Sequence, residues 1–262
     1  MKWIPDSSGR FGVRPQYQRN ELDSECEGII NSFLRAKYGS INLPISTDDL
    51  AIMLELDTSD LDLYADLSSL GHDVDGVTEF LPGKKPRVRI SGALSMNSNL
   101  SRRLRTTLAH EYAHVRLHAF LWTLQLDPED RFWSRLSRQH NRYQQLRERF
   151  EPLKNTELPA MAASRSGFLV DRTHSPQGTT DGDTSDWMEM QANYASRAIL
   201  MPLTALKHLG FQGASKESHA LEAPPETQEQ LEARLADAFD VPIDDVRVRL
   251  AQLKPSSGSI LI

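Results

Sequence analysis

The sequence predicts an α+β fold that is mostly helical, with a small antiparallel sheet and a C-terminal helical segment. Three observations predict it. Apolar residues recur at helical spacing on both sides of the middle of the chain, alternate with polar residues between about 61 and 92, and return to helical spacing over 227–253. Long helices around one short run of strands follow from these patterns.

The composition is that of an ordinary globular protein. The chain has 262 residues, of which 39% are hydrophobic and 25% charged, enough for one domain or two small ones. The single cysteine excludes an intrachain disulfide and a cysteine-rich zinc finger. No apolar run has the length of a signal peptide or a membrane span, so we expect a cytoplasmic protein that contacts no membrane. The net charge of −6 argues weakly against a protein that coats nucleic acid.

The first elements are a tail and two helices. Residues 1–20 are polar and carry glycine, proline and three arginines, so we expect a flexible, poorly packed tail. Apolar residues at helical spacing predict a helix over 21–38 that ends near Gly39. Ser46-Thr47-Asp48 predicts the cap of a second, shorter helix.

The sheet is predicted from alternation. The stretches 61–64, 76–81 and 87–90 alternate apolar and polar side chains, and the Pro-Gly-Lys-Lys-Pro run at 82–86 predicts a hairpin turn between the last two. We expect these strands to pair antiparallel. A long helix over about 99–120 follows.

The second half of the chain is predicted to be helical apart from one long loop. Helices are expected over 127–150 and 186–200, and as a pair over 227–253. The stretch 154–185 is rich in serine, threonine, glycine, aspartate and proline, which predicts a loop.

The sequence His110-Glu111-Tyr112-Ala113-His114 lies in the predicted helix over 99–120. Residues four apart share one face of a helix, so His110 and His114 can bind one Zn²⁺. Glu111 lies beside them and can accept a proton from water. The alternative is a buried helix with two incidental histidines.

A catalytic zinc site needs a third protein ligand. His118 lies roughly 12 Å from His110 along the helix axis, which is too far for one ion to bind both. We therefore expect His118 to support a ligand or to pack, and the third ligand to come from another segment. Glu189 is the strongest distant candidate, with Asn193 one turn further on to orient it. By pattern alone, however, Glu189 is one carboxylate among 36 acidic residues and is better explained as a solvated helix glutamate.

Two motifs resemble a known family. Residues 105–114 resemble the R-x-T-x-A-H-E-x-x-H helix of the ImmA/IrrE family of zinc metallopeptidases. Residues 189–195, followed by 199–202, resemble that family's E-x-x-A-N-x-F-A…L-L-M-P segment, although Ala195 stands where the aromatic is usual. The resemblance covers about 25–205, less a middle insertion. It implies a zincin-like fold with zinc held by His110, His114 and Glu189, and with Glu111 as general base.

The resemblance also implies an organisation of the chain. After the tail of 1–20, a zinc peptidase domain would span 21–205, with an insertion over about 120–185. A helical, helix-turn-helix-like segment would span 206–262. We expect that segment to support the peptidase or to bind a partner rather than to read DNA. The donor that stabilises the oxyanion stays open among four residues: His118, Tyr194, Tyr112 and His174.

The insertion carries a stripe of arginines in the helix predicted over 127–150: Arg131, Arg135, Arg138 and Arg142. One interpretation is an amphipathic cover helix with a solvated basic side. The other is a surface over 131–149 for an acidic partner or for nucleic acid, with single-stranded DNA as an activator. Cys26 is expected in the core of the first helix, and the alternative is that its thiolate caps the zinc. His174 is a second candidate for an occluding zinc contact.

The function that the resemblance implies is site-specific cleavage of a partner helix-turn-helix repressor. Cleavage would relieve repression in a stress-response, mobile-element or phage-defence system. The alternative is an anti-repressor or toxin-system component that acts by binding, with little or no proteolysis. A broad housekeeping peptidase is a third hypothesis, and it predicts degradation of unrelated unfolded proteins.

Overall fold

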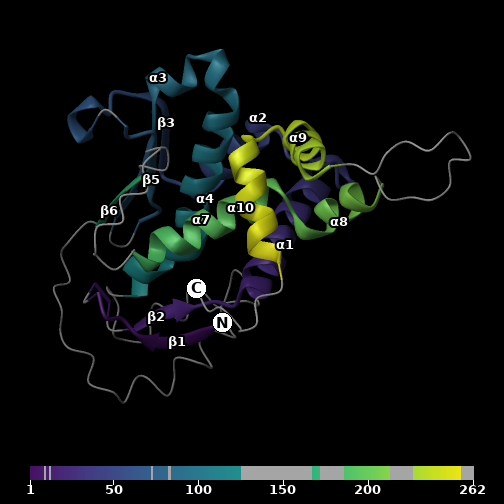
Figure 1. Cartoon of the computed structure of the whole chain (residues 1–262). Coiled ribbons are helices and arrows are strands. Elements are labelled where there is room, and N and C mark those ends of the chain that lie inside the picture. Colours follow the sequence, from purple (N-terminus) through teal and green to yellow (C-terminus); the bar gives the residue numbers. More distant parts are fainter. Residues whose placement is uncertain are drawn as a thin grey trace, which may run out of the picture.

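The computed structural model describes residues 1–124, 167–171, 186–212 and 227–254, apart from 9, 12, 72, 82 and 83. It has the mixed α+β class that the sequence predicts. Long helices occupy the centre of the molecule, a four-stranded sheet lies on one side, and a two-stranded hairpin lies beneath them (Figure 1). No helix among the described residues is long and apolar enough to cross a membrane.

The expectation of a flexible N-terminal tail is wrong. Strands β1 (Lys2–Pro5) and β2 (Val13–Gln16) form an antiparallel hairpin in which Trp3 pairs with Pro15. An isolated two-stranded hairpin is marginally stable, so its order comes from packing. The ring of Phe11 is buried and meets Trp122 edge to face with 4.8 Å between centroids, which anchors the hairpin to helix α4 (Ser101–Leu124).

The first two helices form as predicted. Helix α1 (Arg19–Tyr38) ends at Gly39, whose φ of 73° is the left-handed conformation that favours glycine. Helix α2 (Thr47–Asp57) begins after Ser46, whose side chain accepts a hydrogen bond from the backbone N–H of Asp49. The inner face of α1 enters the main core through Leu22, Cys26, Ile30 and Leu34.

The four-stranded sheet is mixed rather than antiparallel. Its order is β3 (Asp60–Ala65), β5 (Arg87–Ser91), β4 (Gly76–Phe80) and β6 (Gly167–Asp171). β4 pairs antiparallel with β5, as the turn at 82–86 predicts, but β3 pairs parallel with β5. Alternation reports which face of a strand is buried and not which strand lies beside it, so the sequence pattern left the direction of β3 undetermined.

Strand β6 lies within the stretch predicted as a loop, and that part of the prediction is wrong. It pairs antiparallel with β4 along its whole length, from Gly76 opposite Asp171 to Phe80 opposite Gly167. The outer edge of β4 is therefore covered by a strand from the insertion. The helix predicted over 127–150 lies outside the described residues.

Helix α7 (Trp187–Leu200) packs along α4. Two short helical elements directly precede α4, namely α3 (Gly92–Ser95) and η2 (Ser98–Leu100), and a third, η1 (Ser68–Leu70), lies between β3 and β4. The side chain of Asp186 caps α7 by accepting from the N–H of Met188. Buried alanines on α7 let the two helix backbones approach closely: Ala192, Ala195 and Ala198. α7 lies across α4 (Figure 1). Contacts of Glu189 with His110 and His114 place the predicted zinc motif at this crossing.

The C-terminal helices are α8 (Leu203–Gln212), α9 (Gln228–Phe239) and α10 (Ile243–Leu253). The last two form the pair predicted over 227–253, whereas no separate helix was predicted over 203–212. Phe239 and Val246 belong to the same core cluster as Leu108 of α4. Arg249, fully buried on α10, donates a 2.6 Å hydrogen bond to Asp23 of α1. The helix pair is therefore part of the main core.

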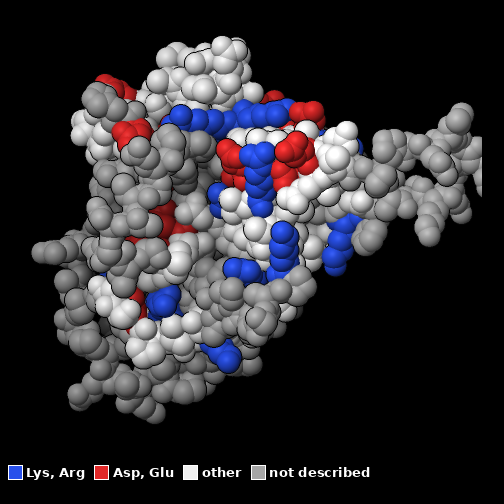
Figure 2. Space-filling model, viewed as in Figure 1, with Lys and Arg blue, Asp and Glu red and all other residues white. Residues whose placement is uncertain are grey.

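The outer face of the helix pair carries mixed charge. Acidic and basic side chains lie interleaved over α9 and α10 (Figure 2). Arg102 pairs with Asp237 and Asp240, and Arg247 pairs with Glu232 and Asp244. Pairing of this kind leaves no continuous basic surface among the described residues of the two helices. It does not favour contact with a phosphate backbone.

Candidate metal centre

The two histidines of the zinc motif and Glu189 meet at the crossing of α4 and α7. The side chains of His110 and His114 are buried, and their Nε2 atoms lie 2.9 Å apart. Glu189 Oε2 lies 3.2 Å from His110 Nε2, and Glu189 Oε1 lies 3.4 Å from His114 Nε2. One candidate ligand atom from each of the three residues lies within 4.8 Å of those of the other two. The three predicted ligands are thus brought together.

The donor set fits one zinc ion. Imidazole nitrogen and carboxylate oxygen are common zinc ligands, and two ligand atoms of a tetrahedral zinc lie about 3.3 Å apart. The separations between the three groups run from 2.9 to 3.4 Å. Glu189 keeps 27% of its side chain exposed, so the cluster reaches solvent on that side. Together the three residues can hold an ion and leave one side open.

Glu189 is ionised, as a ligand must be. Burial alone would raise the pKa of its carboxyl, but His114 and His110 outweigh that effect and hold the pKa well below its usual range. The carboxylate charge offsets the positive charge that a divalent cation would bring into a buried site.

Glu111 lies against β4. The hydroxyl of Thr78 donates a hydrogen bond to Glu111 Oε2, and both side chains are fully buried. A Cβ at position 76 would lie 2.5 Å from Glu111 Oε1 and 2.9 Å from Thr107 Cγ2, so Gly76 leaves the room that the carboxylate occupies. The strand therefore fixes the position of the predicted general base beside the histidines.

His118 contacts the candidate ligand His114 and is not itself part of the group of three candidate ligands. Its Nδ1 lies 3.0 Å from His114 Nδ1, and its Nε2 lies 3.2 Å from Gln191 Oε1. Burial, and then the neighbouring His114, lower the pKa of His118 well below its usual value, so the ring is neutral. The one-turn spacing after His114 produces this contact.

Two hydroxyls predicted as oxyanion donors are bound elsewhere. Tyr194 donates a 3.0 Å hydrogen bond to Asp23, and burial raises its pKa to about 12. Tyr112 donates a 3.1 Å hydrogen bond to Asp57, and burial raises its pKa as well. Tyr112 is two residues from each histidine and therefore points away from their face of α4. The structure does not place either hydroxyl in the group formed by His110, His114 and Glu189.

The remaining predicted residues have no described contact with the three candidate ligands. The backbone carbonyl of Asn193 accepts hydrogen bonds from Arg197 and Ser196, and a role of its side chain in orienting Glu189 stays a prediction. Cys26 is buried in the core of α1. His174 and the arginine stripe lie outside the described residues: Arg131, Arg135, Arg138 and Arg142.

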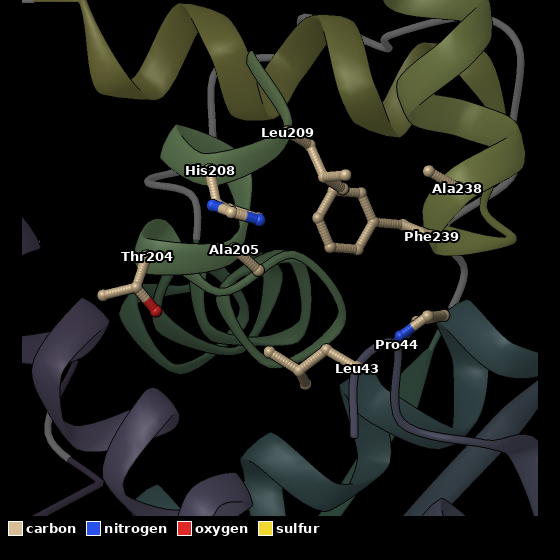
Figure 3. Close-up of a pocket in the computed structure, with 8 residues that line it drawn as sticks. All are labelled: Leu43, Pro44, Thr204, Ala205, His208, Leu209, Ala238 and Phe239. Atoms are coloured by element: carbon tan, nitrogen blue, oxygen red, sulfur yellow. The ribbon is translucent and has the colours of Figure 1, made fainter. Parts of the chain in front are cut away.

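A cavity of about 370 Å³ lies apart from the metal cluster. It is lined by α8, the end of α9 and the segment around Leu43 and Pro44, with Phe239 and His208 facing into it (Figure 3). None of its lining residues belongs to the cluster of His110, His114 and Glu189.

The sequence pattern did not point to three residues of the site: Gly76, Thr78 and Gln191. Gly76 and Thr78 lie in a predicted strand, but no local sequence pattern indicates that this strand packs against Glu111. Gln191 follows Glu189 by two positions and looks like an ordinary polar helix residue.

Comparison with known proteins assigns no family. A scan against protein-family models found none that matches the chain, and a search of curated proteins found no matching relative.

Proposed function

We propose that this chain is a zinc-dependent endopeptidase with a zincin-like fold. The observation that carries the proposal is the meeting of His110, His114 and Glu189 within 4.8 Å, with Glu111 held next to the two histidines. Two histidines, one carboxylate and an adjacent glutamate base form the donor set of a hydrolytic zinc site.

The residues of the site would have three roles: metal binding, proton transfer and positioning of the base. His110, His114 and Glu189 would hold the ion, and bound zinc supplies Lewis acidity that activates water and polarises a peptide carbonyl. Glu111 accepts a proton of the attacking water and returns it to the leaving amine, so water and peptide give a carboxylic acid and an amine. Thr78 keeps the Glu111 carboxylate in place through its hydrogen bond.

The substrate class rests on the resemblance to the ImmA/IrrE family. We propose a partner helix-turn-helix repressor, whose cleavage relieves repression in a stress-response, mobile-element or phage-defence system. The C-terminal helices support this role indirectly, because their mixed charge and buried packing suit a structural or protein-binding element. Activation by single-stranded DNA through the arginine stripe stays a prediction.

Glu111→Gln tests the proposal. The change keeps the size of the side chain and the zinc ligands but removes the base. The wild-type chain, Glu111→Gln and the exposed control Glu55→Gln are each co-expressed with a helix-turn-helix protein encoded beside this chain, and cleavage is read on a gel. We expect cleavage by the wild type and the control and none by Glu111→Gln.

The same variants separate the alternatives when repression is followed with a reporter gene and unrelated unfolded proteins are offered as substrates. If Glu111→Gln still relieves repression, the chain acts by binding, as an anti-repressor or toxin-system component. If the wild type degrades unrelated unfolded protein as readily as the repressor, it is a housekeeping peptidase. Either result contradicts site-specific proteolysis.

A further inference from the structure

A chain of buried contacts connects the N-terminal hairpin to the metal cluster. The Nε2 of Gln191 donates a 2.8 Å hydrogen bond to the carbonyl of Pro15 in β2. The amide oxygen of Gln191 lies 3.2 Å from His118 Nε2, and His118 Nδ1 lies 3.0 Å from His114 Nδ1. The three side chains on α4 and α7 are at most 1% exposed, so water does not compete for these contacts.

The carbonyl of Pro15 determines which atom donates and which accepts at each step of this series of contacts. A carbonyl accepts and cannot donate, so the Gln191 atom that faces Pro15 is the amide nitrogen, and its oxygen faces His118. That oxygen accepts, so His118 carries its proton on Nε2. A neutral ring has one proton, so His118 Nδ1 accepts from His114 Nδ1. His114 is left with a lone pair on Nε2, the atom that faces His110 and Glu189.

Side chains of the N-terminal hairpin also contact the start of α7. The guanidinium of Arg14 lies over the ring of Trp187, 5.4 Å from its centroid, and that ring meets His118 edge to face at 5.5 Å. Arg10 forms a 2.6 Å ion pair with Asp186, the cap of α7. These contacts fix β2 against the start of the helix that carries Glu189 and Gln191.

We propose that Gln191 is a positioning residue of the metal centre. Anchored by the Pro15 carbonyl, it sets the tautomer of His118, which in turn presents the Nε2 lone pair of His114 to the metal. The N-terminal hairpin is thereby a part of the metal centre and not an appendage. This inference rests on the proposed zinc site, because it concerns how one ligand is oriented. Partners that orient a metal-bound histidine typically change affinity by 10- to 100-fold.

Zinc affinity provides the first test. The variant Gln191→Met removes both hydrogen-bonding groups at similar volume, and Ser196→Ala is a matched control, since Ser196 is a buried polar residue of the same helix outside the chain of contacts. Affinity is measured by competition with a chromophoric chelator, and folding is checked by circular dichroism. We expect Gln191→Met to bind zinc 10- to 100-fold more weakly than the wild type, and Ser196→Ala to match the wild type.

Coupling between residues provides the second test. His118→Phe removes the acceptor of His114 Nδ1–H. If Gln191 acts through His118, the double variant binds zinc no more weakly than His118→Phe alone. Additive losses would show that Gln191 acts by another route and would overturn the proposal.

The tautomer can be observed without any variant. Side-chain nitrogen shifts of the wild type, measured by NMR, should show His118 protonated on Nε2 and His114 protonated on Nδ1. The opposite tautomer of His118 overturns the proposal even if Gln191→Met fails to fold. Zinc binding that is unchanged in a folded Gln191→Met also overturns it and leaves the zinc site intact. A wild type that binds no zinc refutes the proposed function itself.

Discussion

The hydroxyl of Thr78 donates a hydrogen bond to the carboxylate of Glu111, which joins strand β4 to the zinc motif of α4. Removing this donor leaves a buried carboxylate with one hydrogen bond fewer. We predict that Thr78→Val lowers kcat about 10- to 100-fold and leaves zinc affinity within about twofold of the wild type, because no ligand is touched. Steady-state kinetics and chelator competition measure the two quantities. A loss of zinc with unchanged kcat would contradict the role given to Thr78.

Gly76 makes the room in which Glu111 lies. A methyl group there would stand 2.5 Å from Glu111 Oε1, so the carboxylate must move. We predict that Gly76→Ala reduces kcat by about 10²-fold, as expected for a misplaced catalytic group. Steady-state kinetics of the folded variant measure the loss.

A second glycine supplies the control for that change. Gly28 is exposed on α1, and a methyl group added there would meet nothing within 4 Å. Gly28→Ala should therefore keep full activity and raise the free energy of unfolding by about 0.5–1 kcal/mol. Equal activity of the two variants would show that Glu111 does not need its present position.

The ion pair between Arg249 and Asp23 joins α10 to α1 inside the core. Arg249→Met leaves the Asp23 charge buried without its partner, so we predict a loss of about 3–5 kcal/mol in the free energy of unfolding. Adding Asp23→Leu should recover much of that loss. Denaturant unfolding measures both, with Arg87→Met as control, because Arg87 pairs with Asp60 at the surface and should cost about 0.2–1 kcal/mol. A small effect of Arg249→Met would mean that α10 is not anchored by this pair.

The buried carboxylate of Asp49 should make part of the stability of the fold sensitive to acid. Burial acts to raise its pKa, but hydrogen bonds from Lys37, Ser46 and Tyr38 outweigh burial and lower the pKa. A lowered folded pKa means that the stabilisation is complete above the unfolded value of about 3.9 and is lost as the pH falls through the folded value. The stability difference between wild type and Asp49→Asn should therefore be constant above about pH 5 and shrink below about pH 4. A difference that stays constant to pH 2 would contradict this.

The sequence predicted those features that depend on local spacing. His110 and His114 are one helical turn apart, so any helix there brings them together. The capping serine and Gly39 likewise marked helix ends through their own backbone preferences. Glu189 is different, because its contact with the histidines arises from the packing of α7 on α4, and the residue pattern alone did not separate it from other glutamates.

The features that were missed depend on packing between distant segments. The hairpin of β1 and β2 contains Pro5 and Pro15 and has weak strand character by itself, and it is ordered by aromatic contacts such as that of Phe11 with Trp122. Arg249 would be placed at the surface by its charge, yet it is fully buried because Asp23 lies opposite. The link from Pro15 to His118 through Gln191 joins three segments that no periodicity relates.

The most direct test of the zinc centre is the metal content of the purified chain, measured by elemental analysis for the wild type and for Glu189→Ala. Glu189 is the ligand that the zinc motif itself does not contain, so its removal tests the assembled site. We predict one zinc ion per wild-type chain and loss of that zinc in Glu189→Ala. A wild type without zinc, or a Glu189→Ala variant that retains a full equivalent, would contradict the assignment of His110, His114 and Glu189 as the ligands.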